Sequence, residues 1–249
     1  MRFFFYVFLL LKITMILNPV KIFAYDFSEK EIKVKNSDIL ISWIVDKNSF
    51  PEYWQNREIN PQAESLKKKY FKNTLSVIEK AISKYPASFL NKNLKKVYVF
   101  HSLKFYGISY GGSNSRARVY LTSAGRSSGY TDEYIEMSFH HELSSILLRN
   151  HKTQFSEDKW KACNEPSFQY GKGGVNAIKE NKASLSGAEK YYQKGFLNQY
   201  GKSALEEDFN TYAGEYFVNQ DSLEELAKSY PTIQCKLSIL KNFYKDIIK

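Results

Sequence analysis

Cysteine is scarce in this sequence. The 249 residues include only two cysteines, Cys163 and Cys235. Their wide spacing does not suggest a metal site. In an oxidising compartment one disulfide is the simple interpretation, and two free buried thiols are the alternative.

Long hydrophobic runs are absent after residue 24. The first 24 residues are typical of a secretory signal peptide, because Arg2 precedes an apolar run over 3–11 and the small residue Ala24 stands at the expected cleavage point. A membrane span needs about 20 predominantly apolar residues. Since Lys12 interrupts the run, an uncleaved anchor is the less favoured alternative. We therefore expect a secreted or periplasmic protein of residues 25–249, with no stable membrane span after signal cleavage.

The sequence also lacks a cluster of arginines interleaved with aromatic residues. The chain has 36 Lys and Arg against 26 Asp and Glu, a formal net charge of +10, but the lysines are spread along its length. Such a distribution argues against a nucleic-acid partner and favours weak attraction to anionic surfaces. The chain is 43% hydrophobic and shows no internal repeat, so we expect one domain with a sizeable core over 25–249.

Hydrophobic periodicity predicts an α+β chain. Apolar residues at helical spacing, or β-branched and aromatic runs, indicate the elements in their order. Predicted helices cover about 62–84, 131–151, 204–218 and 234–249, and predicted strands cover 94–100 and 119–122, with a short strand or helix at 38–45. We expect a loop or hairpin over 102–118 and a polar, loop-rich stretch over 152–187. Ser203 and Glu206 have the spacing of a capping box at the start of the third helix.

The helix over 131–151 contains three of the four histidines, and one expected histidine is missing from it. Thr131 is a good N-cap. His141 and Glu142 form the first half of a zincin motif, in which a histidine binds zinc and the glutamate activates the metal's water. The second histidine should stand one turn later, where the sequence has Ser145. The alternative is an ordinary helix with solvated or core-bound histidines.

A second segment favours the zincin interpretation of this helix over the ordinary one. Tyr200 is followed seven residues later by Glu207, which begins the run Glu-Asp-Phe-Asn-Thr, and Gly195-Phe-Leu-Asn-Gln leads into the tyrosine. Together with the His-Glu helix, this pattern resembles the gluzincin metallopeptidases related to the catalytic domain of anthrax lethal factor, and the Gly-Phe-Val-Ser-x-Tyr segment of bacterial zinc-binding peptidases. The resemblance covers 131–151 and 195–217, and the rest of the chain only by the order of its elements.

The resemblance implies a zincin-like fold: a small mixed sheet beside an active-site helix, with an edge strand that can pair with an extended substrate, and a mostly helical C-terminal half. It also implies Zn²⁺ as cofactor. His141 and Glu207 would be zinc ligands, with Glu206 a less favoured carboxylate. Glu142 would be the general base, and Tyr200 would donate its hydroxyl to the developing oxyanion. Asp208 would orient a ligand histidine.

Two departures from the family pattern bear on activity. Ser145 replaces the second histidine, and Thr211 replaces the second glutamate of the later run. Catalytic zinc normally has three protein ligands and a water, and His141 with Glu207 makes only two. His140 lies about 100° round the helix from its neighbour. His101 and His151 remain candidates for a third ligand, and the residues give no basis for choosing among the three.

The sequence therefore supports two functional hypotheses. The first is an exported zinc metallopeptidase that hydrolyses peptide bonds in a peptide or protein substrate with metal-activated water. The second is a catalytically degenerate zincin that binds a peptide or protein without cleaving it, which Ser145 favours. Ser144 and Ser145 beside His141 do not form a recognised serine-hydrolase arrangement. The substrate and the oligomeric state are not indicated.

Overall fold

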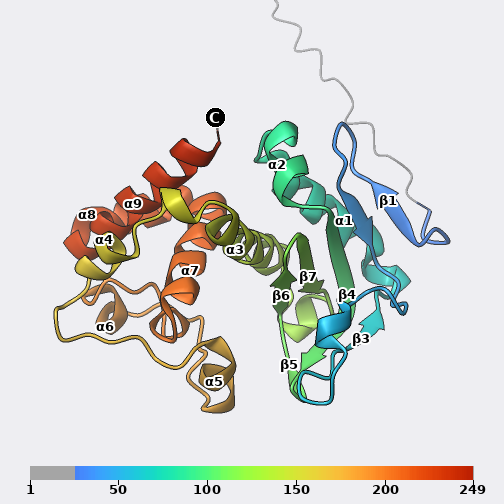
Figure 1. Cartoon of the computed structure of the whole chain (residues 1–249), viewed down its shortest axis with the longest axis horizontal. Coiled ribbons are helices and arrows are strands. Elements are labelled where there is room, and N and C mark those ends of the chain that lie inside the picture. The colour runs from blue at the N-terminus through green and yellow to red at the C-terminus, as the bar shows by residue number, and fades with distance from the viewer. Residues whose placement is uncertain (1–25, 249) are drawn as a thin grey trace, which may run out of the picture.

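The computed structural model describes residues 26–248, and the predicted signal segment 1–24 lies outside them. The strands form one mixed sheet, seen on the right of Figure 1. Their bounds are β1 Glu31–Lys33, β2 Leu40–Ser42, β3 Gln62–Ser65, β4 Lys96–Phe105, β5 Ile108–Ser109, β6 Gly112–Ser115 and β7 Arg118–Thr122.

The long strand β4 is the centre of the sheet. The order of the main path is β1-β2-β4-β7-β6, and β3 and β5 pair with the far end of β4. The β2–β4 and β4–β7 pairs are parallel, whereas the β1–β2 and β6–β7 pairs are antiparallel. Strand β6 is thus an edge strand of the main path, and its backbone runs antiparallel to β7 only.

Both faces of β4 are buried, because its side chains alternate between two clusters. Val97 and Val99 belong to the main core under the helices. Tyr98 and Phe100 point to the opposite face, into an aromatic cluster with Phe50. The sheet therefore packs against a hydrophobic cluster on each of its two faces along most of β4.

The helices lie on one side of this sheet. Helix α3 runs through the middle of the molecule, and the C-terminal helices lie beyond it on the left of Figure 1. The helix bounds are α1 Lys68–Ser83, α2 Ala87–Asn93, α3 Asp132–Asn150, α4 Glu157–Ala162, α5 Gly174–Lys179, α6 Glu189–Tyr192, α7 Leu205–Val218, α8 Gln220–Ser229 and α9 Pro231–Ile247.

Helix α3 begins as its sequence predicts. The side chain of Thr131 accepts a hydrogen bond from the backbone N–H of Tyr134 at 3.1 Å, which is N-capping geometry. Ile135, Phe139 and Leu143 are buried in the main core. Helix α7 packs on α3 through the same core, and polar residues of α3, among them Ser138 and Glu142, face a cavity.

The α+β prediction is confirmed, including the small mixed sheet and the mostly helical C-terminal half. Several bounds were wrong. Residues 62–65 form strand β3 and not the start of a helix, and β4 continues to Phe105, so that His101 lies within it. The N-cap of α7 is Ala204, without a side-chain cap, and Ser203 makes no capping hydrogen bond. The predicted capping box is therefore absent.

One disulfide joins the loop-rich stretch to the last helix. Cys163, just after α4, is bonded to Cys235 on α9. Of the two interpretations of the cysteines, the disulfide is the one the structure has. Among residues 26–248, no helix combines the length and the apolar character that crossing a membrane requires.

Candidate functional site

A cavity lies between α3, α7 and the edge of the sheet. Helix α3 contributes residues at helical spacing, and so does α7, because each helix turns one polar face toward the other. The cavity also receives the start of β6 and the segment around α5. Its lining includes Tyr110, Gly111 and Gly112 from the sheet, Tyr134, Met137, Ser138, His141 and Glu142 from α3, Asn210, Thr211, Gly214 and Glu215 from α7, and Ile178, Ala183, Leu185, Asn198 and Tyr200 from the connecting segment.

The two segments that resemble the gluzincins meet at one end of this cavity. His141 Nε2 lies 3.0 Å from Glu207 Oε2, although the residues are 66 positions apart in the sequence. The Tyr200 hydroxyl lies close to Glu207, and its ring stacks near the His141 imidazole with centroids 6.1 Å apart. The backbone of Gly174 is so close that a β-carbon there would stand 2.3 Å from the Tyr200 hydroxyl. These side chains therefore form one contact group, while their catalytic roles remain predictions.

Glu142 lies beside this group and is held by the edge strand. The side-chain amide of Asn114, on β6, donates to Glu142 Oε2 at 2.7 Å. Arg149, two turns further along α3, donates in turn to Asn114 Oδ1. A β-carbon at Gly112 would stand 2.7 Å from Glu142 Oε1, so this glycine permits the close approach of β6 to α3. The carboxylate position is thus set by the sheet edge as well as by its own helix.

The electrostatics of the site follow from burial and close charges. Burial lowers the pKa of His141, but the hydrogen bond to Glu207 and the charges of Glu142 and Glu207 outweigh it and raise that pKa above its usual value. Burial raises the pKa of Glu142 to about 7, against the lowering effect of His141 and of the Asn114 hydrogen bond. The contact with Glu207 therefore favours the protonated form of the His141 imidazole, and burial favours the neutral form of Glu142.

The position of the missing histidine is filled by a neutral hydrogen-bond network. Asn210, on α7, donates to the Ser145 hydroxyl oxygen at 2.6 Å. The hydroxyl of Ser144 donates to the carboxamide oxygen of the same asparagine. All three side chains are at most 2% exposed. Ser145 is therefore engaged with its neighbour across the helix interface.

The other histidines lie away from this group. His140 is fully buried on another face of α3, with Nδ1 at 2.8 Å from the Tyr85 hydroxyl. His151 Nε2 lies 3.1 Å from Asn93 Oδ1, and the His101 ring stacks on Tyr70. None of the three candidates supplies a third ligand next to His141.

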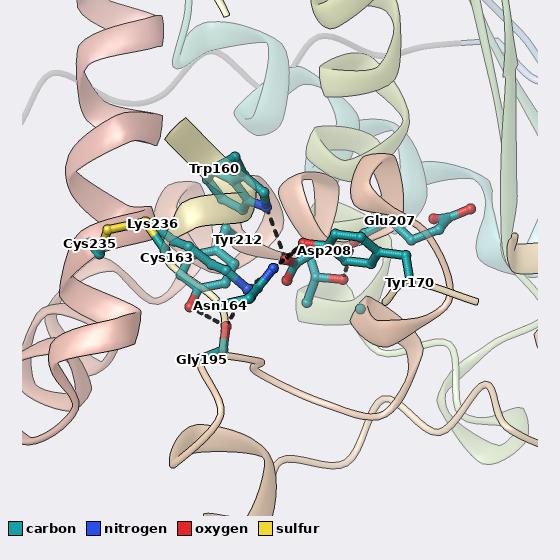
Figure 2. Close-up of polar contacts among 12 residues, drawn as sticks. Trp160, Cys163, Asn164, Tyr170, Gly195, Glu207, Asp208, Tyr212, Cys235 and Lys236 are labelled. Carbon is teal, nitrogen blue, oxygen red and sulfur yellow. Dashed lines mark hydrogen bonds and ion pairs between the residues drawn. A yellow bond between two sulfur atoms is a disulfide. The ribbon is translucent and has the colours of Figure 1, made fainter. Parts of the chain in front are cut away.

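Asp208 does not orient a histidine, and that prediction was wrong. Its Oδ2 accepts from Lys236 Nζ at 2.7 Å, from Trp160 Nε1 at 2.9 Å and from the Tyr170 hydroxyl at 2.6 Å. Figure 2 shows this network next to the disulfide, with the Glu207 side chain directed the opposite way. Asp208 thus anchors the first turn of α7 to α4 and α9. Glu206, the less favoured carboxylate, pairs at the surface with Arg149.

Sequence reasoning missed three residues of the site. Asn114 lies in a stretch that was assigned to a loop or hairpin, so its contact with Glu142 had no visible signal. Asn210 stands where the family run has alanine. A polar residue at this position, in a chain that also has Ser145, was the only sequence signal for a contact between the two. Glu215, about two turns beyond Glu207 on α7, also lines the cavity, and no spacing pattern in the sequence connects it to the other site residues.

The residues present do not fit a resident catalytic zinc. In the described residues 26–248, no group of three or more His, Cys, Asp or Glu side chains converges as metal ligands would. Beside His141 and Glu207 lie the Glu142 carboxyl group, which accepts a hydrogen bond from Asn114, and the phenol of Tyr200. Burial, followed by the charges of Glu207 and Glu142, raises the pKa of Tyr200 far above its usual value, which keeps the phenol protonated. Ser145 and Asn210 have no unpartnered polar atom that would indicate a missing cation. Two ligands are fewer than the three that catalytic zinc sites keep.

Comparison with known proteins supports the fold and leaves the family open. No protein-family model matches the chain, and no curated protein matches its sequence. The structure is similar to the crystal structure of a putative zinc-binding metallo-peptidase from Bacteroides caccae, with a TM-score of 0.52 and 15% sequence identity, over 85% of this chain and 79% of that one. At this identity the similarity concerns the fold alone. The chain therefore has a metallopeptidase-like fold.

Proposed function

We propose that this protein is a degenerate zincin that binds an extended peptide segment of another protein in its cleft without cleaving it. The observation that carries the proposal is the Ser145–Asn210 hydrogen bond at 2.6 Å. It occupies the position where the family has a metal-binding histidine, and it joins α3 to α7 with neutral groups that satisfy each other. A metal would have to be held by His141 and Glu207 without a third ligand.

The cleft retains the features that hold a peptide. Strand β6 lies at the sheet edge beside the cavity, and an extended chain can add to such an edge by backbone hydrogen bonds. Aromatic and apolar side chains from three parts of the chain, among them Tyr110, Tyr134 and Leu185, line the space. Leu185 is 53% exposed, an unusual position for a large apolar side chain. These groups offer side-chain contacts next to a strand-pairing surface.

The retained group of His141, Glu142, Tyr200 and Glu207 favours a second candidate, an active zinc metallopeptidase. It requires that the metal be completed by atoms that this chain does not supply, such as those of the substrate or of water. A carboxyl group with a pKa near 7 suits general-base or general-acid catalysis, which is the role the family resemblance gives to Glu142.

We further propose that the protein acts outside the cytoplasm, after removal of residues 1–24. The Cys163–Cys235 disulfide supports this location, because disulfides persist in oxidising compartments.

The proposal can be tested with a library of fluorescein-labelled peptides and the chain from residue 25 onward. Fluorescence anisotropy measures binding, and mass spectrometry of the same mixtures, with and without added zinc, measures cleavage. We expect saturable binding and intact peptides. Ser138→Trp should abolish binding by filling the cavity, whereas the matched control Ser238→Trp, on the exposed surface of α9, should bind as the wild type does.

Two outcomes would contradict the proposal. If no peptide binds to the folded wild type, the cleft is not a peptide site. If peptides are cut by the wild type and left intact by Glu142→Gln, the second candidate is correct and the protein is an enzyme.

A further inference from the structure

The cavity is acidic in a chain that is strongly basic. The whole chain has 36 Lys and Arg residues, yet none of them lines the cavity among the residues that the structure describes. Its charged lining residues are Glu142 and Glu215 together with His141, and Glu207 lies directly behind that histidine. Lysine and arginine are the most common charged residues of the chain, and yet the described lining of the cavity contains neither.

Two carboxylates outside the cavity have lysine partners in the same structure. Glu136 pairs with Lys80 and Lys84, and Glu224 pairs with Lys241. Glu215 differs from them. Its neighbours include the side-chain amide of Asn219, which donates to Oε2 at 3.0 Å, and the like charge of Glu133.

Glu133 and Glu215 share one neutral donor. The amide nitrogen of Asn219 lies 2.8 Å from Glu133 Oε1 and 3.0 Å from Glu215 Oε2, so it bridges the two carboxylates. Burial raises the pKa of Glu215, and the charge of Glu133 adds to the increase. A neutral amide does not cancel the repulsion between two carboxylates. A cation between them would remove this repulsion and form charge-assisted hydrogen bonds.

The position of this acidic pair relates it to the rest of the cleft. Glu215 is eight residues beyond Glu207 on α7, which corresponds to roughly 12 Å along the helix axis at 1.5 Å per residue. An extended peptide covers that distance in about four residues, at 3.3 Å each. A side chain bound at Glu215 therefore belongs to a residue about four positions from the one beside His141.

We propose that the cleft recognises a peptide with a lysine or arginine side chain, and that Glu215, with Glu133, binds its cationic end group. This inference rests on the proposed peptide binding and adds its specificity. Tyr134 and Met137, which line the cavity next to Glu133 and one helical turn beyond it, offer apolar and aromatic contacts for the aliphatic part of such a side chain.

The test compares peptides that differ in one side chain. A fluorescein-labelled peptide with a single lysine is paired with its norleucine counterpart, which keeps the aliphatic part and lacks the charge. We expect the wild type to bind the lysine peptide about tenfold more tightly, the size of one charge-assisted hydrogen bond. Glu215→Gln should remove the preference, and Glu215→Lys should reverse it in favour of a glutamate peptide. The control Glu225→Gln makes the same charge change on the exposed surface of α8 and should keep the preference.

The outcomes separate this inference from the proposed function. Equal binding of the lysine and norleucine peptides by the wild type overturns the specificity and leaves peptide binding intact. A preference that persists in a folded Glu215→Gln variant, checked by circular dichroism, also overturns it. Failure of every peptide to bind the wild type overturns both proposals.

Discussion

The ion pair of Lys236 and Asp208 makes the most quantitative prediction. The two side chains are 0% and 1% exposed, and their charged atoms lie 2.7 Å apart. Lys236 also donates to the backbone oxygen of Gly195 at 2.8 Å, and its ammonium lies 3.9 Å from the centre of the Phe196 ring. Replacing Lys236 with methionine keeps the volume and removes the charge, so Asp208 would remain buried without a cation.

Removal of one partner of a buried ion pair costs about 3–5 kcal/mol. We expect the lower end of this range, about 3 kcal/mol, because Trp160 and Tyr170 would still donate to Asp208. For a domain of this size the loss corresponds to a fall of roughly 6–12 °C in melting temperature. The double variant Lys236→Met/Asp208→Asn has neither charge, and should recover at least about 2 kcal/mol relative to the single lysine variant.

Urea unfolding followed by tryptophan fluorescence, with the disulfide intact, measures these free energies. Lys241→Met is a matched control on the same helix, because Lys241 pairs with Glu224 at the surface and both are more than a third exposed. It should change stability by no more than about 0.5 kcal/mol. A loss below about 1 kcal/mol for Lys236→Met, or strictly additive costs in the double variant, would refute the buried ion pair as an anchor of α7.

Three further predictions concern stability. Cys163→Ser/Cys235→Ser should lower the free energy of unfolding by about 4 kcal/mol, the chain-entropy value for a loop of this length, and a loss under about 1 kcal/mol in urea titrations would argue against the disulfide. Gly214→Leu should cost at least about 1–3 kcal/mol by overpacking, because a β-carbon there already lies 3.3 Å from the backbone oxygen of Met137 on α3; an unchanged melting temperature would show that the helices can separate freely. Burial, followed by the charges of two nearby lysines, lowers the pKa of His140 well below its usual value. Below about pH 6.5 the folded state therefore binds fewer protons at this residue than the unfolded state does. The contribution of His140 to the free energy of unfolding should decrease as the pH is lowered, by up to about 1.4 kcal/mol per pH unit. Glu142 and His141 have raised pKa values and contribute in the opposite sense, so the effect of His140 is measured as the difference between the wild type and His140→Gln; a difference that does not change between pH 7 and 5.5 would contradict the neutral, buried imidazole.

Local sequence signals predicted the parts of this fold that depend on local chemistry. The start of α3 at Asp132 follows from Thr131, whose side chain caps the helix. The alternation of β-branched and aromatic residues located β4 and β7. The errors came where tertiary contacts overrode local pattern. Residues 62–65 precede apolar residues at helical spacing but pair with β4, and Ser203 has the right neighbours for a cap that the backbone does not use.

Part of the site could also be predicted from a pattern in the sequence. His141, Glu142, Tyr200 and Glu207 could be selected because a spacing pattern connects them, and the fold brings His141 and Glu207 within 3.0 Å. Asn114 and Glu215 belong to no such pattern, because their positions depend on which strand forms the sheet edge and on which face of α7 meets α3. Asp208 was predicted to orient a ligand histidine, but its carboxylate instead accepts hydrogen bonds from buried cationic and aromatic side chains. No local rule predicts that Lys236, 28 residues away, is its partner.

The zinc content of the purified chain tests the central claim most directly. Wild-type protein would be dialysed to equilibrium against zinc and measured by elemental analysis beside Ser145→His/Asn210→Ala, which restores the family's histidine and removes the asparagine bound to Ser145. Our account predicts far less than one zinc ion per wild-type chain and a clear gain toward one in the double variant. One tightly held zinc ion per wild-type chain, lost in His141→Ala, would contradict the account and identify the cleft as a metal site.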